Sequence, residues 1–463
     1  MQFTDILKSL PEVKAPLEKR LDFNTKLKWT LIILGAFFIM SNIALFGADA
    51  GFLEQFEFLA VIMGTSFGSI ISLGIGPIVM ASIILQLLVG AQILEIDTST
   101  EEGKKFFQGL QKLLVFFFIL FEAIIYVMMG GIRAAPGFRY IVIFQLILGG
   151  LAILFMDEVC HKWGFGSGVS LFIAAGVGWR LITASFAFLG TEGNFQASGA
   201  VVSLIYNLIN SDVAGAQTAI MLASVAIIAT IVLFLIVVWA QSLKIEIPLS
   251  YDRLRGYSLR WPLQFFYASV IPVILTAALI ANFQLFGGLL QNWLGHPTIL
   301  GNFVDGRAVC NENGCGFLYW VSSTDIVQRI LTGSWETTLL GQTFGHILFY
   351  MLFAALFSVF WVKTSGMDAS AQADNILKSG LQIPGFRKDK RILESILARY
   401  VMPLTIMGGL AIGLLASTAD VLGALVGGTS LLLGIMITFQ FYENIAQQHA
   451  MDMNPALKKL MGV

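Results

Sequence analysis

Ten apolar segments, each about 20 residues long, constrain the fold of this chain more than any other feature. An α-helix needs about 20 apolar residues to cross the hydrocarbon core of a bilayer. Hydrophobic residues make up 57% of the chain and charged residues only 12%, whereas soluble domains carry about 25% charged residues. The sequence therefore predicts an all-α polytopic membrane protein. The predicted spans are 29–47, 71–93, 107–130, 139–158, 169–190, 215–240, 263–289, 337–362, 398–418 and 424–443.

The distribution of basic residues predicts the orientation. An even number of spans places both termini on one side, and 23 of the 28 Lys and Arg residues fall on that side when loops are assigned alternately. Cytoplasmic loops carry the excess of basic residues, so both termini of this multi-pass protein are expected on the cytoplasmic side of a cell membrane. The five basic residues on the other side are Arg133, Arg139, Arg180, Arg307 and Arg329.

The segment 51–69 is partly apolar but too interrupted to cross a membrane. No Lys or Arg occurs between Lys28 and Lys104, so counting this segment as a span would invert every later loop and remove the charge bias. We therefore expect it to enter and return on the outer side. A non-helical segment at membrane depth must be buried in protein or line a cavity. Two interpretations stay open from the residues alone, a re-entrant stopper in a central cavity and a helix on the outer leaflet.

Four longer stretches carry motifs spread along the chain. They are LGIGPIVMASIILQLLVG (73–90), DEVCHKWGFGSGVSLFIAAGV (157–177), IPVILTAALIANFQL (271–285) and GFRKDKRILESILARYVMPLT (385–405). In this order they resemble the second helix, the fourth-to-fifth helix junction, the seventh helix, and the eighth loop with the ninth helix of the SecY family. Members of this family are channel subunits of the protein-conducting translocon. The resemblance covers most of the chain and is closest to archaeal members.

The resemblance implies ten transmembrane helices in two pseudo-symmetric halves around an hourglass pore. It also implies a short re-entrant plug helix at about 52–68, which favours the stopper interpretation of this segment. The plug residues carried over are Phe56, Phe58, Leu59, Val61, Ile62, Gly64, Ser66 and Phe67.

An aliphatic ring forms the constriction in this family. A constriction without fixed charge excludes ions because water leaves it, and every matching position here is a branched aliphatic residue. Taken alone, each such residue would be read as facing lipid or core. The ring positions carried over are Ile75, Val79, Val169, Ile173, Ile274 and Leu415.

Polar residues inside spans are expensive and therefore informative. Glu122 lies deep in the third span and Asn282 in the seventh. The resemblance places both in a lateral gate between the second and third helices and the seventh and eighth, and Gln86 could join them. The alternative is a packing hydrogen bond between helices, which contributes modestly in membranes. At the position of Met80 the family often carries a residue with a hydroxyl group, so this chain departs from the family pattern there.

Two long cytoplasmic loops, 241–262 and 363–397, hold clustered basic residues. Positive-inside charge alone would explain them in an arbitrary membrane protein. In the SecY family these loops dock the ribosome, and in bacteria the motor ATPase SecA; clustered Arg also suits the RNA phosphate backbone. The docking residues predicted are Arg253, Arg255, Arg387 and Lys388. The resemblance implies two small partners as well, SecE (gamma) and a single-span beta subunit in a heterotrimer.

The predicted function is a passive pore that passes unfolded secretory polypeptides and releases transmembrane segments sideways into lipid. Its ligands would be signal sequences and nascent chains, with no cofactor, metal or catalytic residue. A secondary transporter with inverted repeats is the alternative, but Glu122 is the one clearly deep acidic residue. An enzyme is disfavoured because no H-E-x-x-H or P-loop motif occurs. Cys310 and Cys315 flank NENG in one loop, and either a disulfide or two free thiols fits them.

The predicted organisation follows from these spans. Its segments are an N-terminal cytoplasmic segment 1–28, a first half 29–190, an external loop with the sixth helix 191–240, a cytoplasmic loop 241–262, the seventh and eighth helices 263–362 with external loop 290–336, a cytoplasmic loop 363–397, the last two helices 398–443 and a cytoplasmic tail 444–463.

Overall fold

A helix lies at each of the ten predicted spans. The computed structural model describes residues 10–17, 21–49, 60, 62–96, 100–188, 195–210, 216–251, 258–268, 270–304, 306–310, 315–378, 381–382 and 389–453. Eight of the described helices are long and apolar enough to cross a membrane. The ten helices are α2 (Phe23–Ser41), α3 (Gly76–Gly90), α4 (Glu101–Met128), α5 (Arg139–Trp163), α6 (Gly168–Phe186), α8 (Ala216–Ser242), α9 (Ile271–Leu294), α12 (Thr338–Thr364), α14 (Lys390–Val421) and α15 (Gly428–Met453).

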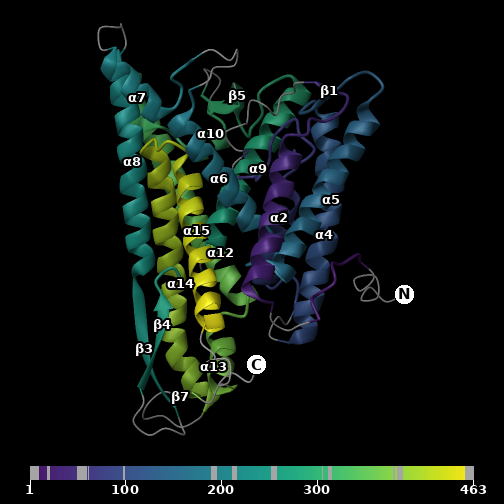
Figure 1. The fold of residues 1–463 in the computed structure, drawn as a ribbon, viewed down its shortest axis with the longest axis vertical. Coiled ribbons are helices and arrows are strands. Elements are labelled where there is room, and N and C mark those ends of the chain that lie inside the picture. Colours follow the sequence, from purple (N-terminus) through teal and green to yellow (C-terminus); the bar gives the residue numbers. More distant parts are fainter. Residues whose placement is uncertain are drawn as a thin grey trace.

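Short elements gather at the two ends of this helical bundle (Figure 1). Strands β3, β4 and β7 and helix α13 lie at the end where the chain terminates, and β1, β5, α7 and α10 lie at the opposite end. The bounds are β1 Ala48–Asp49, β2 Arg133–Ala134, α7 Ala200–Ile209, β3 Lys244–Tyr251, β4 Ser258–Gln264, β5 Asn302–Val304, β6 Arg307–Val309, α10 Phe317–Val321, α11 Ile326–Leu331, α13 Ala369–Lys378 and β7 Leu381–Gln382.

Local sequence signals set several helix ends. The Thr100 hydroxyl accepts the Gly103 N–H at 3.1 Å at the start of α4, and the Asp389 carboxylate accepts the Arg391 N–H at 2.9 Å at the start of α14. Both are N-caps that satisfy otherwise unpaired amides. Helix α9 begins with Pro272 in its first turn and ends at Gly295 in the left-handed conformation, which follows the usual preference for Pro at the start and Gly past the end.

Two helix boundaries differ from the predicted spans for a physical reason. Helix α9 begins at Ile271 rather than at 263, because Ser258–Gln264 pairs with β3 in an antiparallel hairpin. Helix α14 begins at Lys390, before the apolar run that starts near 398, because its first turns are amphipathic and bury Leu393 and Leu397 against β3, β4 and α13. Hydropathy reports only the part of a helix that lies in lipid.

The interior of the bundle contains α9. Within its most apolar stretch, 83% of the residues are buried, whereas the corresponding value for α8 is 17%. A helix that is apolar and buried on all sides belongs to the middle of a bundle. The large apolar core combines residues of α3, α6, α9 and α14, so both halves of the chain contribute to it.

The loops 241–262 and 363–397 share one sheet. Strand β7 from the second loop pairs with β3 from the first, with Ser250 opposite Gln382, giving the order β4-β3-β7. Glu443 of α15 accepts a hydrogen bond from the Gln264 side chain at 3.2 Å and lies 3.9 Å from the Lys244 ammonium. The base of the hairpin is therefore joined to the last helix.

Candidate functional site

Residues 62–74, which we call the return segment, include the end of the predicted plug and lead to Ile75 at the start of α3. They form turns rather than a helix. Met63, Ser69, Ile71 and Ser72 are all at most 4% exposed. This burial is what a non-helical segment at membrane depth requires, and it excludes a position on the surface of the outer leaflet for these residues.

The return segment satisfies much of its own backbone. The Thr65 hydroxyl reaches the carbonyl oxygens of Ile71 at 2.7 Å and Ser72 at 2.8 Å. The Ser69 hydroxyl donates to the Ser66 carbonyl at 2.6 Å. Such side-chain bonds replace a helical ladder where water is scarce. Gly74 has φ of 56°, and a Cβ there would collide with the Met63 carbonyl oxygen. The close approach of the backbone at residues 63 and 74 therefore requires glycine.

The return segment rests directly on the first of the predicted ring residues. The Ile75 N–H donates to the Met63 carbonyl at 2.8 Å. A Cβ on Gly64 would lie 3.3 Å from Ile75 Cγ2 and 3.5 Å from Phe172 Cβ. Phe172 precedes the ring position Ile173 on α6. The segment therefore packs against both α3 and α6 at the level of the predicted constriction.

The six predicted ring residues come from four helices and join one apolar cluster. Ile75, Val79, Ile173 and Ile274 are at most 4% exposed, and Val169 and Leu415 are half-buried against the same cluster.

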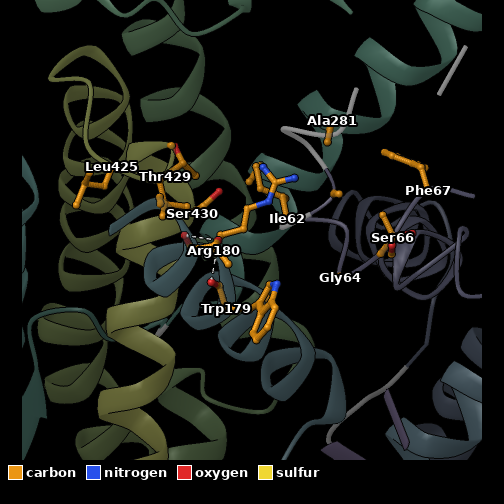
Figure 2. Close-up of a pocket in the computed structure, with 18 of the residues that line it drawn as sticks. Ile62, Gly64, Ser66, Phe67, Trp179, Arg180, Ala281, Leu425, Thr429 and Ser430 are labelled. Atoms are coloured by element: carbon orange, nitrogen blue, oxygen red, sulfur yellow. Dashed lines mark hydrogen bonds between the residues drawn. The ribbon is translucent and has the colours of Figure 1, made fainter. Parts of the chain in front are cut away.

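A cavity of about 1080 Å³ lies on the side of the ring where α2 and α6 end. Figure 2 shows Arg180 of α6 between Ile62 on one side and Ser430 on the other. Of the predicted plug residues, four line this cavity, namely Ile62, Gly64, Ser66 and Phe67. The other four lie outside the described residues, namely Phe56, Phe58, Leu59 and Val61, as does the greater part of the predicted plug helix.

The lateral gate is predicted between α3 with α4 and α9 with α12, and we call this interface the seam. Its three predicted residues are buried on three different helices. Glu122 of α4 and Asn282 of α9 are 0% exposed, and Gln86 of α3 is 4% exposed. Asn282 donates to the Ala278 carbonyl of its own helix at 2.8 Å. The side-chain oxygen atoms of all three residues have no hydrogen-bond partner among the described residues. A Cβ on Gly76 would lie 3.1 Å from Glu122 Oε2, so this carboxyl group lies beside the start of α3.

Sequence reasoning missed a polar contact that bridges the predicted seam. The Asn292 amide of α9 donates to the Met129 carbonyl at the end of α4 at 2.8 Å. By contrast, Gln111 of α4 donates to the Ser82 hydroxyl of α3 at 2.7 Å, which joins two helices on the same side of the seam. No feature of the sequence near Asn292 distinguishes it from other polar residues at helix ends.

We expect Asn292→Ala to weaken the outer end of the seam. Loss of one exposed hydrogen bond is worth about 0.5–1.5 kcal/mol, so the rate of translocation of a substrate with a weak signal sequence should rise by about 2- to 10-fold. The measurement uses the complex reconstituted in vesicles. Asn210→Ala is the matched control, because among the described residues the Asn210 amide donates to the Tyr206 carbonyl of its own helix end. A slower or unchanged Asn292→Ala variant would contradict the assignment.

A second polar cluster, also missed, lies between α10, α12, α14 and α15. His346 of α12 contacts Asp420 of α14, which in turn binds Thr429 of α15. The outer loop beside it contains the disulfide Cys310–Cys315, with Cα atoms 4.4 Å apart. Of the two possibilities that the sequence left open for these cysteines, the structure has the disulfide.

The predicted docking residues Arg253, Arg255, Arg387 and Lys388 lie outside the described residues. The described strands around them are informative nonetheless. Because β7 pairs with β3, the two loops that carry these residues leave the same small sheet at the end of the bundle where α13 lies (Figure 1).

Fold and site together define a class of protein. Eight described helices are long and apolar enough to cross a membrane, the predicted ring residues belong to one buried apolar cluster, and a cavity of about 1080 Å³ lies beside the return segment. This combination is typical of a membrane channel.

Comparison with known proteins identifies the family. The sequence matches SecY over residues 69–442 and the plug domain of Sec61p over residues 36–68. It is 42% identical to the protein translocase subunit SecY of Methanothermobacter thermautotrophicus, covering 100% of this chain and 98% of that protein. The chain belongs to the SecY family of protein translocase channel subunits, which are channels and not enzymes.

Solved structures agree with this assignment. A SecY channel structure concerned with the plug domain, which stabilises the closed state and maintains a membrane seal, has a TM-score of 0.82 and 35% identity over 99% of this chain and 100% of that chain. Sec61 in a canine ribosome-channel complex has a TM-score of 0.78 and 34% identity over 99% and 100%. The predicted family, fold, plug and channel function are thereby confirmed, and the transporter alternative is set aside.

Proposed function

We propose that this chain forms a passive pore for unfolded polypeptides in which the plug, residues 52–68, closes an aliphatic ring. The observation that carries the proposal is the hydrogen bond between the Met63 carbonyl and the Ile75 N–H, because it joins the return segment to the ring itself. The ring residues proposed are Ile75, Val79, Val169, Ile173, Ile274 and Leu415.

An aliphatic ring suits the passage of polypeptide without a leak of ions. The six side chains carry no charge and belong to one apolar cluster. Because such a ring offers water no hydrogen-bond partner, it stays dry when no polypeptide is present. Aliphatic side chains also make only nonspecific contacts, so substrate side chains of many kinds can pass the ring. The pore itself does no work, so a partner must supply the energy for directed movement.

The seam between α3 with α4 and α9 with α12 is proposed as the lateral gate. Buried polar atoms without partners destabilise a closed interface by about 1–3 kcal/mol each. Glu122, Asn282 and Gln86 present such atoms among the described residues. A gate that opens for each signal sequence or transmembrane segment benefits from a closed state that is only moderately stable.

The proposed partners follow from the family and from the cytoplasmic sheet. Sec61 is found in a ribosome-channel complex, which supports a ribosome as the partner of the loops that carry Arg253, Arg255, Arg387 and Lys388. SecE and a small beta subunit are proposed for the heterotrimer. We further propose a cell membrane as the location, with both termini cytoplasmic, and the division of the chain into segments given above.

Displacement of the plug is tested at Met63. This residue is 1% exposed, so a Met63→Cys thiol should react slowly with an impermeant reagent when the complex is idle. A secretory chain stalled in the pore should increase the labelling rate at least about tenfold, since it must break the contact of residue 63 with Ile75. The background carries Cys160→Ala, and the Cys310–Cys315 disulfide is kept.

Ser66→Cys is the matched control for this test. Ser66 lines the cavity and is half-buried, so its thiol should already react in the idle complex and change less. Equal labelling of Met63→Cys with and without a stalled chain would contradict a displaced plug.

A further inference from the structure

His346 and Asp420 form the centre of a hydrogen-bonded cluster that ties the outer loop 290–336 to the second half of the bundle. His346 Nδ1 lies 2.6 Å from the Val321 carbonyl oxygen at the end of α10, and His346 Nε2 lies 3.2 Å from Asp420 Oδ2. The Thr429 N–H donates to Asp420 Oδ1 at 2.7 Å. His346 is 1% exposed and Asp420 9% exposed, and both line the 1080 Å³ cavity.

The arrangement fixes the number of protons in the pair. A carbonyl oxygen only accepts, and an ionised carboxylate only accepts, whereas a neutral imidazole has one N–H to give. Both ring nitrogens of His346 face such acceptors. The two contacts are hydrogen bonds at the same time only if the His346–Asp420 pair holds one proton more than a neutral imidazole and a carboxylate.

The groups around the pair are few among the described residues. Tyr350 of the same helix lies with its ring 4.8 Å from the imidazole, and Arg180 of α6 lines the same cavity. In the loop 290–336, burial raises the pKa of Asp325; Arg307 and Arg329 lower it, and the nearby Asp420 raises it further, so Asp325 is a charged neighbour of the pair. The facing residues of α9 and α15, Gln284 and Thr429, carry no charge.

We propose that His346 is a positioning residue that holds the outer loop over the cavity through a proton shared with Asp420. While the proton is present, α12 is bonded both to α14 and to α10. When it leaves, one of the two bonds must break, because the remaining single N–H cannot serve both acceptors. The remaining N–H goes to the carboxylate of Asp420, because a hydrogen bond to a charged acceptor is stronger than one to a carbonyl, so the bond to Val321 is lost and the loop 290–336 is released on its α10 side.

The test measures hydrogen–deuterium exchange of the α10 region, residues 315–331, in the purified complex between pH 5 and pH 9, corrected for the intrinsic exchange rate. In the wild-type protein the corrected exchange should rise by about tenfold or more across this range, since a hydrogen bond that involves a charged group is lost. Asp420→Asn is the decisive variant. Its amide supplies a permanent donor to Nε2, so neutral His346 can donate to Val321 at every pH, and exchange should stay low up to pH 9.

His296→Phe is the matched control, because His296 lies exposed in the same loop and contacts only the neighbouring Pro297 carbonyl among the described residues. It should keep the wild-type pH profile. His346→Phe should exchange fast at all pH values. A flat wild-type profile, or an Asp420→Asn variant that follows the wild-type rise, would overturn the proposal, and the Asp420→Asn result stands even if His346→Phe does not fold.

Discussion

The variant Gly149→Ala should let ions leak through the idle channel. Gly149 of α5 packs against the return segment so closely that a Cβ would collide with the Ile70 carbonyl oxygen. A backbone carbonyl cannot rotate away as a side chain can, so the return segment must shift. Overpacking of this kind costs about 1–3 kcal/mol, which corresponds to about a 5- to 150-fold larger population of the displaced state. Single-channel conductance of the reconstituted complex measures this population.

Gly178→Ala in α6 is the control for this experiment, because no atom of another described element lies within 4 Å of the position of its Cβ. It replaces the same residue type in a membrane helix without touching the return segment, and it should conduct like the wild-type complex. If Gly149→Ala also remains closed and unfolds at the wild-type temperature, the tight packing between α5 and residues 69–71 does not hold the seal.

The variant Glu122→Leu should close the seam more firmly and slow translocation. Both carboxyl oxygens of Glu122 are buried without a partner among the described residues. Replacing an unpaired buried polar group with an apolar side chain removes a penalty of about 1–3 kcal/mol. The rate for a substrate with a weakly hydrophobic signal sequence should therefore fall by about 5- to 150-fold, while a strongly hydrophobic signal sequence should be less affected.

Phe121→Leu is the matched control, since Phe121 is the neighbouring residue on α4 and is 40% exposed. It introduces the same side chain on the outer face of the helix and should leave the rate unchanged. A Glu122→Leu variant that translocates faster would mean that this carboxyl group holds the seam closed rather than loosening it. Glu122→Leu and Asn292→Ala are thus expected to move the rate in opposite directions.

The spans and the non-crossing segment could be predicted because both depend on local composition. A run of about 20 apolar residues is needed to cross lipid, and the gap in basic residues between Lys28 and Lys104 determined the parity of the loops. The six ring positions came from the family resemblance, and hydropathy alone would not have separated them from lipid-facing Ile and Val residues. Their function as a ring remains our proposal.

Contacts between distant segments could not be predicted. The pairing of Ser250 with Gln382 and the bond from Asn292 to Met129 join residues more than a hundred positions apart, and neither depends on a local pattern. The same holds for His346 and Asp420, each of which looks like an isolated polar residue near a helix end. Hydropathy indicates whether a segment prefers lipid or water, but it does not identify the residues that the segment contacts.

The hydroxyl groups of the return segment bear on how often the seal can be reused. Thr65, Ser69 and Ser72 bond to carbonyls of the same segment, whereas the backbone bond between Met63 and Ile75 joins it to the ring. The Ile70 N–H donates to the Ile43 carbonyl at 3.0 Å and the Leu45 N–H donates to the Gly68 carbonyl at 3.0 Å, so the middle of the segment is anchored to the residues that follow α2. If the return segment keeps these internal bonds, it can rotate about that anchor as a preformed unit. It then remakes its contact with Ile75 without refolding. Closure after each substrate would then be limited by the swing itself and not by rebuilding the stopper.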